Sequence, residues 1–244
     1  MASAIDWFFQ REKEGIILED DCLPSPEFFT FCDTLLERYR HDPRIRHIGG
    51  TNVQFGKNRG DASYYFSRLV HVWGWASWRR AWKDYDKNLS RWTEDEIGAA
   101  LDRIFHEPLV AEQWRQIVSK LKANQIDTWD YQWGITNFVL DGLSVIPNQN
   151  LITNIGFGPG ATHTINVQAR HAAVPHGSLG SLTHPSVQAP NEEADFFTLS
   201  EEFQLEKLRA QHEAQQRKYK RFKYRLKRWI ARHGGPKRWI NAGK

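Results

Sequence analysis

Three acidic side chains follow one another directly after a short apolar run near the start of the chain. Glu19, Asp20 and Asp21 come after residues 16–18, which read Ile-Ile-Leu. Such a run predicts a buried strand, and open α/β sheets bind their ligands at the carboxyl ends of strands. Adjacent carboxylates repel one another, and a hard divalent cation neutralises that repulsion. The pattern therefore indicates a metal site, with an ordinary loop or helix cap as the alternative.

A fourth acid, Asp130, stands among tryptophans. Trp129 precedes it and Trp133 follows three residues later. A carboxylate can accept the proton of an attacking hydroxyl group, and flanking indoles can stack on a ligand and desolvate the acid. Asp130 is therefore a candidate general base. The alternative is that these tryptophans pack in the core and Asp130 caps a helix.

A glycine-bearing loop is the third candidate site. Gly156, Gly158 and Gly160 stand at alternate positions, and His163 follows them. Backbone N–H groups of such loops bind phosphate oxygens, and His163 would add a proton-bearing or metal-facing group. The loop lacks the lysine of a Walker motif. A simple turn and an ordinary surface histidine are the alternatives.

Alternating strand and helix patterns surround these candidates. Strands are predicted over 16–18, 46–52 and 64–67, and helices over 4–14, 26–42, 73–82, 95–105 and 110–122. This alternation indicates an α/β layered domain. The 244 residues, 40% of them hydrophobic, suffice for one domain with an appendage. Two cysteines are too few for a disulfide framework and suit a reducing, cytoplasmic compartment.

The later part of the chain changes character. Residues 166–200 are rich in Pro, Ser, Thr and His without apolar periodicity, which predicts a flexible linker. Residues 201–232 contain no proline or glycine and predict one long helix. The tail 201–244 carries 14 Lys and Arg against four Glu, whereas residues 1–200 carry 19 basic and 25 acidic residues. Any polyanion partner should therefore engage the tail alone.

Apolar and basic residues separate onto two faces of this predicted tail helix. The apolar face holds Tyr219, Phe222, Leu226, Trp229 and Ile230, and the basic residues around it are Lys218, Lys220, Arg221, Lys223, Arg225, Lys227 and Arg228. This pattern is typical of a helix lying in an anionic membrane interface. Docking on the body or on a second chain is the alternative. Nucleic acid is not expected, because no folded reader accompanies the basic tail.

Five segments occur in the order of the motifs of one known family. They are GIILEDDCLPSPEFF from Gly15, IGGTN from Ile48, SRLVHVWGWASW from Ser67, WDYQW from Trp129 and NIGFGPGATHT from Asn154. Together they resemble the GT-A glycosyltransferases, especially the N-acetylglucosaminyltransferases of N-glycan processing and bacterial nucleotide-diphospho-sugar transferases. The resemblance implies a partial GT-A fold over residues 1–165, a Rossmann-like mixed sheet flanked by helices. It also implies that the N-terminal half that grips the nucleotide is missing.

The resemblance further implies roles for the candidate residues. Asp21 would hold Mn²⁺ or Mg²⁺ against the donor diphosphate, and Glu19 and Asp20 would contact metal-bound water, ribose or sugar. The loop of Gly156, Gly158, Gly160 and His163 would close on the donor, while Trp73, Trp75, Trp129 and Trp133 would bind the acceptor. The implied activity is metal-dependent, inverting transfer from a nucleotide sugar to a glycan or lipid-linked acceptor, which such an enzyme would meet at the cytoplasmic face of the inner membrane. The competing hypothesis is a truncated, non-catalytic relative that binds a membrane or another polyanion through its tail.

Overall fold

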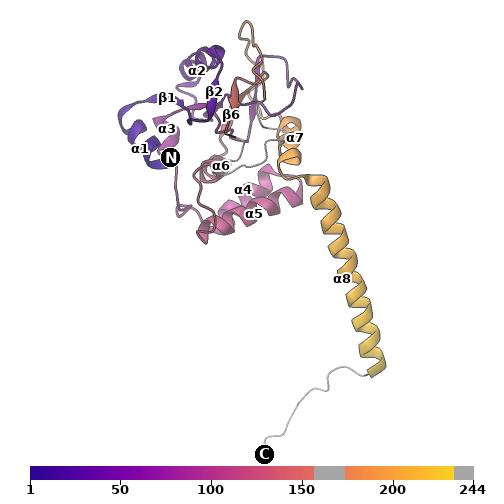
Figure 1. Ribbon diagram of the computed structural model, residues 1–244. Helices are drawn as coiled ribbons and strands as arrows, with labels where there is room; N and C mark the ends of the chain where they lie inside the picture. Colours follow the sequence, from indigo (N-terminus) through magenta and orange to yellow (C-terminus); the bar gives the residue numbers. More distant parts are fainter. Residues whose placement is uncertain (157–173, 234–244) are drawn as a thin grey trace, which may run out of the picture.

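The computed structural model describes residues 1–156 and 174–233, and its centre is a five-stranded sheet (Figure 1). The strands are β1 (Glu14–Ile17), β2 (Cys22–Pro24), β3 (Ile45–Gly49), β4 (Tyr64–Ser67), β5 (Trp75–Trp78), β6 (Leu143–Pro147) and β7 (Ile152–Asn154). The sheet order is β1-β5-β3-β6-β4, and β2 pairs with β7 in a separate ribbon. Only β3 and β6 are parallel neighbours in the sheet. The expected mixed sheet is confirmed.

Eight helices of the described chain cover this sheet or extend from it. They are α1 (Ala2–Arg11), α2 (Pro26–Tyr39), α3 (Arg79–Trp82), α4 (Glu94–Ile104), α5 (Pro108–Lys122), α6 (Asp130–Val139), α7 (Glu192–Glu202) and α8 (Leu205–His233). α2 packs on β1, β3 and β5. Its first residue is Pro26, which suits a helix start, and Phe28, Phe31 and Leu35 are buried at helical spacing.

A cluster of indole rings fills the space between α1, α3, β5 and α6. Trp75, Trp82 and Trp133 lie with ring centroids 5.1 to 5.9 Å apart. Trp75 belongs to β5, and the helix expected over 73–82 forms only as the single turn α3. Gly74 permits this arrangement, since its φ is +65° and a side chain there would meet Ile152.

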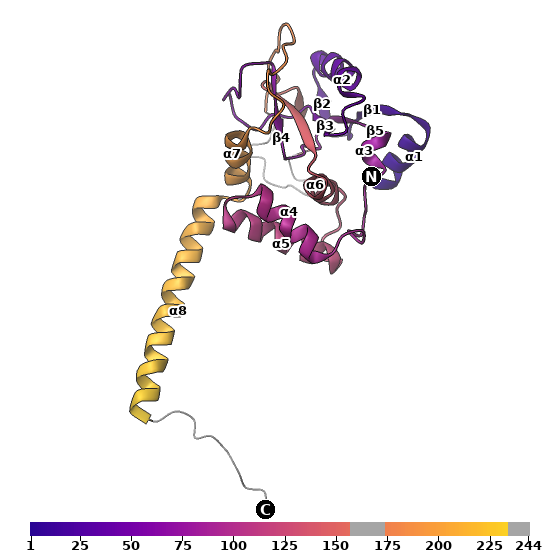
Figure 2. The same cartoon turned by 180° about the vertical axis from the view of Figure 1, so that it is seen from behind.

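A second core joins α6 to the helix pair α4 and α5. Ile135 and Phe138 of α6 pack among apolar side chains of these two helices, while Trp133 on the same helix faces the indole cluster. α6 therefore lies between the sheet and the helix pair (Figure 2). At the start of α4, Thr93 and Glu96 form a reciprocal capping box. This local signal explains why the predicted helix over 95–105 matches α4 closely.

Residues 174–200 return across the body. Leu179 N–H donates to Glu27 at 2.8 Å, and the Gln188 amide donates to Asp42 at 2.8 Å. Asp195 of α7 accepts from Ser67 Oγ at 2.5 Å and from Arg68 N–H at 2.8 Å. These side-chain contacts need no apolar periodicity. Residues 174–200 are therefore part of the folded body and not the flexible linker that their composition predicts.

The chain leaves the body through a break between two helices. α7 ends at Glu202, Gln204 has φ +49°, and α8 begins at Leu205. The single helix predicted from residue 201 is therefore interrupted after its first two residues. α8 then leads away from the body (Figures 1 and 2). Among the described helices, none has an apolar stretch long enough to cross a bilayer.

Candidate functional site

The acidic turn follows β1 at one edge of the sheet. β1 pairs with β5 and ends at Ile17, and Cys22 N–H donates to the Glu19 carbonyl at 3.1 Å to close the turn. Glu19 and Asp21 are half-buried, and Asp20 is exposed. The acids thus stand where the sequence predicts them, at the end of a strand. That strand differs from the expected buried one, because only Ile17 of its four residues is buried.

Gly156 approaches Asp21 closely from the end of β7. A Cβ at Gly156 would lie 2.2 Å from Asp21 Oδ2, so a residue with a side chain would displace the carboxylate. Ile155 N–H also donates to the Asp21 carbonyl at 2.8 Å. However, Gly156 N–H donates to Asn154 Oδ1 at 2.8 Å, so it is not free for a phosphate oxygen as expected. Gly158, Gly160 and His163 lie outside the described residues.

Trp129, which precedes Asp130 in the chain, lies near the acidic turn. Its indole acts on the Glu19 carboxylate and favours a lower pKa there. Burial and the charge of Asp21 raise the pKa of Glu19, and the charge of Asp130 adds to this effect. The turn over residues 19–21 and the Trp129–Asp130 pair are therefore close enough to interact. The fold brings together two candidate sites that the sequence separates by more than 100 residues.

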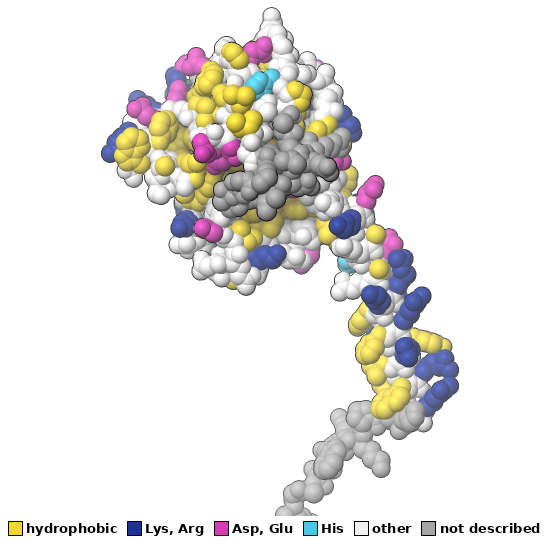
Figure 3. Space-filling model, in the orientation of Figure 1, with side chains coloured by type: hydrophobic (Ala, Val, Ile, Leu, Met, Phe, Trp, Pro, Cys, Tyr) yellow, Lys and Arg dark blue, Asp and Glu magenta, His cyan; other side chains and the backbone are white. Residues whose placement is uncertain are grey.

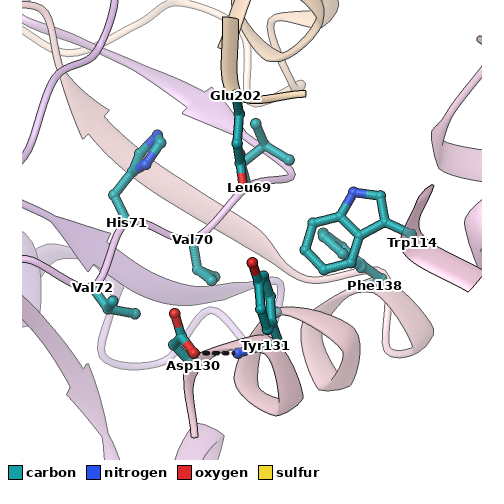
Figure 4. Close-up of a pocket in the computed structure, with 10 residues that line it drawn as sticks. Leu69, Val70, His71, Val72, Trp114, Asp130, Tyr131, Phe138 and Glu202 are labelled. Carbon is teal, nitrogen blue, oxygen red and sulfur yellow. Dashed lines mark hydrogen bonds between the residues drawn. The ribbon is translucent and has the colours of Figure 1, made fainter. Parts of the chain in front are cut away.

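Asp130 is the first residue of α6 and faces a pocket (Figure 4). Its Oδ1 accepts from Tyr131 N–H at 2.9 Å and from the Thr128 hydroxyl. These bonds fit the helix-start alternative, while the second carboxylate oxygen points into the pocket (Figure 4). The cavity measures about 80 Å³, which is room for a few water molecules or a hydroxyl group. Its apolar wall includes Leu69, Val70, Val72, Trp114 and Phe138.

Glu202 supplies a second carboxyl group to this pocket, from the last residue of α7. The residue is exposed as a whole, but its carboxyl points toward the pocket, with the Tyr131 hydroxyl between it and Asp130 (Figure 4). Enclosure by the pocket and the charge of Asp130 raise the pKa of Glu202 to about 7. Burial, together with Glu202 and Asp130, also raises the pKa of Tyr131.

The four tryptophans expected at the acceptor side divide into two pairs. Trp75 and Trp133 are 0% exposed and pack in the core, as the alternative interpretation expected. They do not reach a surface where an acceptor could bind. Trp73 and Trp129 are half-buried. Trp129 stacks on Trp75 at 5.8 Å between ring centroids. An acceptor-facing role is therefore open only to Trp73 and Trp129.

The donor set at the acidic turn suits a cation that a substrate helps to hold. No group of three or more His, Cys, Asp or Glu side chains within residues 1–156 and 174–233 is arranged to hold a metal ion. Mg²⁺ is usually held by one or two carboxylates together with phosphate oxygens and water, so a closed protein cage is not required. Across the same residues, no salt bridge joins Glu19, Asp20 or Asp21 to a basic side chain. Asp21, half-buried beside Gly156, is the carboxylate of the turn that could take part in such a set.

Comparisons with known proteins identify no family for this chain. No protein-family model matches the chain, and no curated protein matches it.

Proposed function

We propose that this chain is a GT-A type glycosyltransferase domain that uses Mn²⁺ or Mg²⁺ at Asp21. The main support is that the acidic turn lies near the Trp129–Asp130 pair, since both Trp129 and Asp130 act on the pKa of Glu19. Glycosyl transfer needs negative charge offset at a leaving diphosphate and a proton acceptor at an incoming hydroxyl. One acidic turn and one acid-lined pocket, side by side, offer these two functions.

On the donor side, Asp21 would hold the cation, and the exposed Asp20 would contact ribose or sugar. Because Gly156 has no side chain, it leaves the space that the Asp21 carboxylate occupies. A bound divalent cation would offset the charge that develops on the diphosphate as it leaves. Glu19 lies near the Trp129 indole in the same turn.

On the acceptor side, a hydroxyl oxygen attacks the anomeric carbon while the bond to the diphosphate breaks. The hydroxyl proton passes to Asp130, whose free oxygen faces the pocket. Glu202 shares this pocket, and its pKa near 7 allows it to receive the proton from Asp130 and release it to water. A single displacement of this kind inverts the anomeric configuration, and a glycan or lipid-linked sugar is the expected acceptor.

Cation binding tests the donor side. Mn²⁺ titrated into the protein with a nucleoside diphosphate should give a calorimetric binding signal, which Asp21→Asn weakens at least tenfold. Asp33→Asn, an exposed acid on α2, is the matched control and should bind as the unchanged protein does. Equal binding by Asp21→Asn and Asp33→Asn would exclude Asp21 as the ligand.

Turnover tests the acceptor side. We expect Asp130→Asn to lower kcat by about 10² to 10⁴ while donor affinity is kept, because the hydroxyl proton loses its acceptor. Release of nucleoside diphosphate from a panel of nucleotide sugars measures this loss. Glu202→Gln should lower kcat less and should change the pH profile near pH 7. If kcat of Asp130→Asn stays within a few-fold, Asp130 is structural and the base lies elsewhere.

A non-catalytic binding module is the second candidate function, and the exposed basic helix α8 favours it. Such a module would not bind Mn²⁺ together with a nucleoside diphosphate, and it would not turn over any nucleotide sugar. The calorimetric experiment on the unchanged protein therefore separates the two candidates.

A further inference from the structure

Helix α8 presents an apolar stripe to solvent. Every side chain from 215 to 232 is exposed. Tyr219 is 63% exposed, Phe222 62% and Leu226 42%. Together with Trp229 and Ile230 they follow three-and-four spacing, which places them on one side of the helix. An apolar stripe of this length on an element that projects from the body indicates a binding surface.

Basic side chains occupy the rest of the same helix. Residues 217–232 contain nine Lys and Arg and no acid. Figure 3 shows apolar side chains mostly along one side of α8 and basic ones mostly along the other. At 1.5 Å per residue this segment is about 24 Å long. The partner must therefore offer an apolar layer and negative charge along the whole of that length.

The base of α8 is fixed to the body, which keeps the stripe away from it. Leu205 is buried, and Arg209 forms a salt bridge with Glu107 at the start of α5. Beyond these contacts the helix extends outward (Figures 1 and 2). The stripe therefore packs on no part of the body that the structure describes, and a separate partner can cover it.

The positive charge of α8 distinguishes among three possible partners: a second copy of the chain, a nucleic acid and a lipid surface. Two copies of α8 would bring nine positive charges on one segment against nine on the other, with no acid between them. Like charges at that density oppose self-association. A nucleic acid would satisfy the basic side chains, but its phosphate backbone would leave the aromatic and aliphatic stripe in water. An anionic lipid surface satisfies both faces, because acyl chains take the stripe and headgroups take the cations.

We propose that residues 217–232 of α8 lie in the interface of an anionic lipid membrane, with the stripe of Tyr219, Phe222, Leu226, Trp229 and Ile230 facing the acyl chains. The body then stands at the membrane surface, held by α7 and the Arg209–Glu107 pair. This proposal does not depend on glycosyl transfer.

Vesicle flotation of the whole protein tests this attachment. Vesicles of phosphatidylcholine with about one third phosphatidylglycerol should carry the protein at low salt, and binding should fall as salt rises. Vesicles of phosphatidylcholine alone should bind at least tenfold less. Equal flotation with both vesicles, or no flotation at low salt, would overturn the proposal.

A pair of matched aromatic substitutions tests the orientation of the helix. Phe222→Ser removes a ring from the stripe, whereas Tyr224→Ser removes an equally exposed ring from the basic face. We expect Phe222→Ser to lower partitioning at least tenfold and Tyr224→Ser to change it less than threefold. Equal losses would overturn the proposed orientation. The circular dichroism of both variants checks that α8 is still helical.

Charge substitutions complete the test. Each of Lys220→Gln, Arg221→Gln and Arg228→Gln should lower partitioning about fivefold, as expected for one cation at an anionic surface. Oligonucleotide binding that Phe222→Ser leaves unchanged, without flotation, would indicate nucleic acid instead. A dimer in sedimentation without flotation would indicate a second copy. Either result would overturn the membrane proposal.

Discussion

Two consecutive helices, α7 and α8, are separated by only two residues, but α7 packs against the body and most of α8 is exposed to solvent. α7 has a weak apolar pattern, yet Ala194, Asp195, Thr198 and Leu199 are buried against the body. α8 has the clearer separation of apolar and basic residues, yet its outer half is exposed throughout. Amphipathic spacing therefore predicts which face of a helix will bind something. It does not predict what that face will bind.

Polar contacts, which periodicity does not register, explain the packing of α7. The Gln54 amide donates to the Thr198 hydroxyl at 2.8 Å and to the Ala194 carbonyl at 3.1 Å. Asp195 accepts from Ser67 and from the backbone of Arg68. These bonds fix α7 on β4 and thereby carry Glu202 to the pocket that contains Asp130. The position of a candidate site residue thus depends on buried polar bonds far from the pocket.

The largest expected effect is the loss of a leucine from α7. Leu199 is 3% exposed and packs in the core of α4, α5 and α6. Leu199→Ala should lower the free energy of unfolding by about 3 to 5 kcal/mol, because it leaves a cavity. Urea denaturation measures this change. A loss below about 1 kcal/mol would mean that α7 is not part of the folded core.

The next effect is a pH dependence that originates at Asp195. Burial raises the pKa of Asp195 to about 6 from the ordinary value of 3.8. The folded protein therefore binds this proton more tightly than the unfolded chain, and the stability so gained is complete below pH 4 and lost as pH rises through 6. The loss amounts to about 3 kcal/mol, by the usual conversion of pKa to free energy.

Asp195→Asn isolates this contribution. The free energy of unfolding of the unchanged protein, minus that of the variant, should fall between pH 4 and pH 8 as Asp195 ionises. Other acids, including Glu202, titrate in both proteins and cancel in the difference. A flat difference would show that Asp195 keeps its ordinary pKa and that α7 is less closely packed than described.

Local signals were sufficient for several elements of the fold. The predicted strand over 64–67 has the bounds of β4, and the helices predicted over 95–105 and 110–122 match α4 and α5 within two residues at each end. Breakers, caps and apolar spacing determine these elements. β5 lies within the tryptophan-rich stretch 73–82, which was predicted as helix. Its pairing with both β1 and β3 determines the strand, and such pairing is a tertiary contact.

The candidate site was predicted in pieces. The acids at 19–21 and Asp130 were found from their types and neighbours, and the resemblance suggested that they act together. Glu202 was missed, because residue 201 was assigned to the start of an exposed tail. Only the break at Gln204 and the packing of α7 bring Glu202 to Asp130, which is 72 residues earlier. A tertiary contact of this kind has no local signal.

The smallest expected effect is the loss of a leucine from α8, the counterpart of the α7 substitution. Leu226 is 42% exposed, and no buried core contains it. Leu226→Ala should therefore change the free energy of unfolding of the body by less than about 0.5 kcal/mol, as is usual for surface substitutions. Flotation on phosphatidylglycerol vesicles should nevertheless fall, because the same methyl groups face acyl chains when α8 is bound. If Leu226→Ala destabilised the body as much as Leu199→Ala does, the stripe would pack on the body in solution, and the contrast between α7 and α8 would disappear.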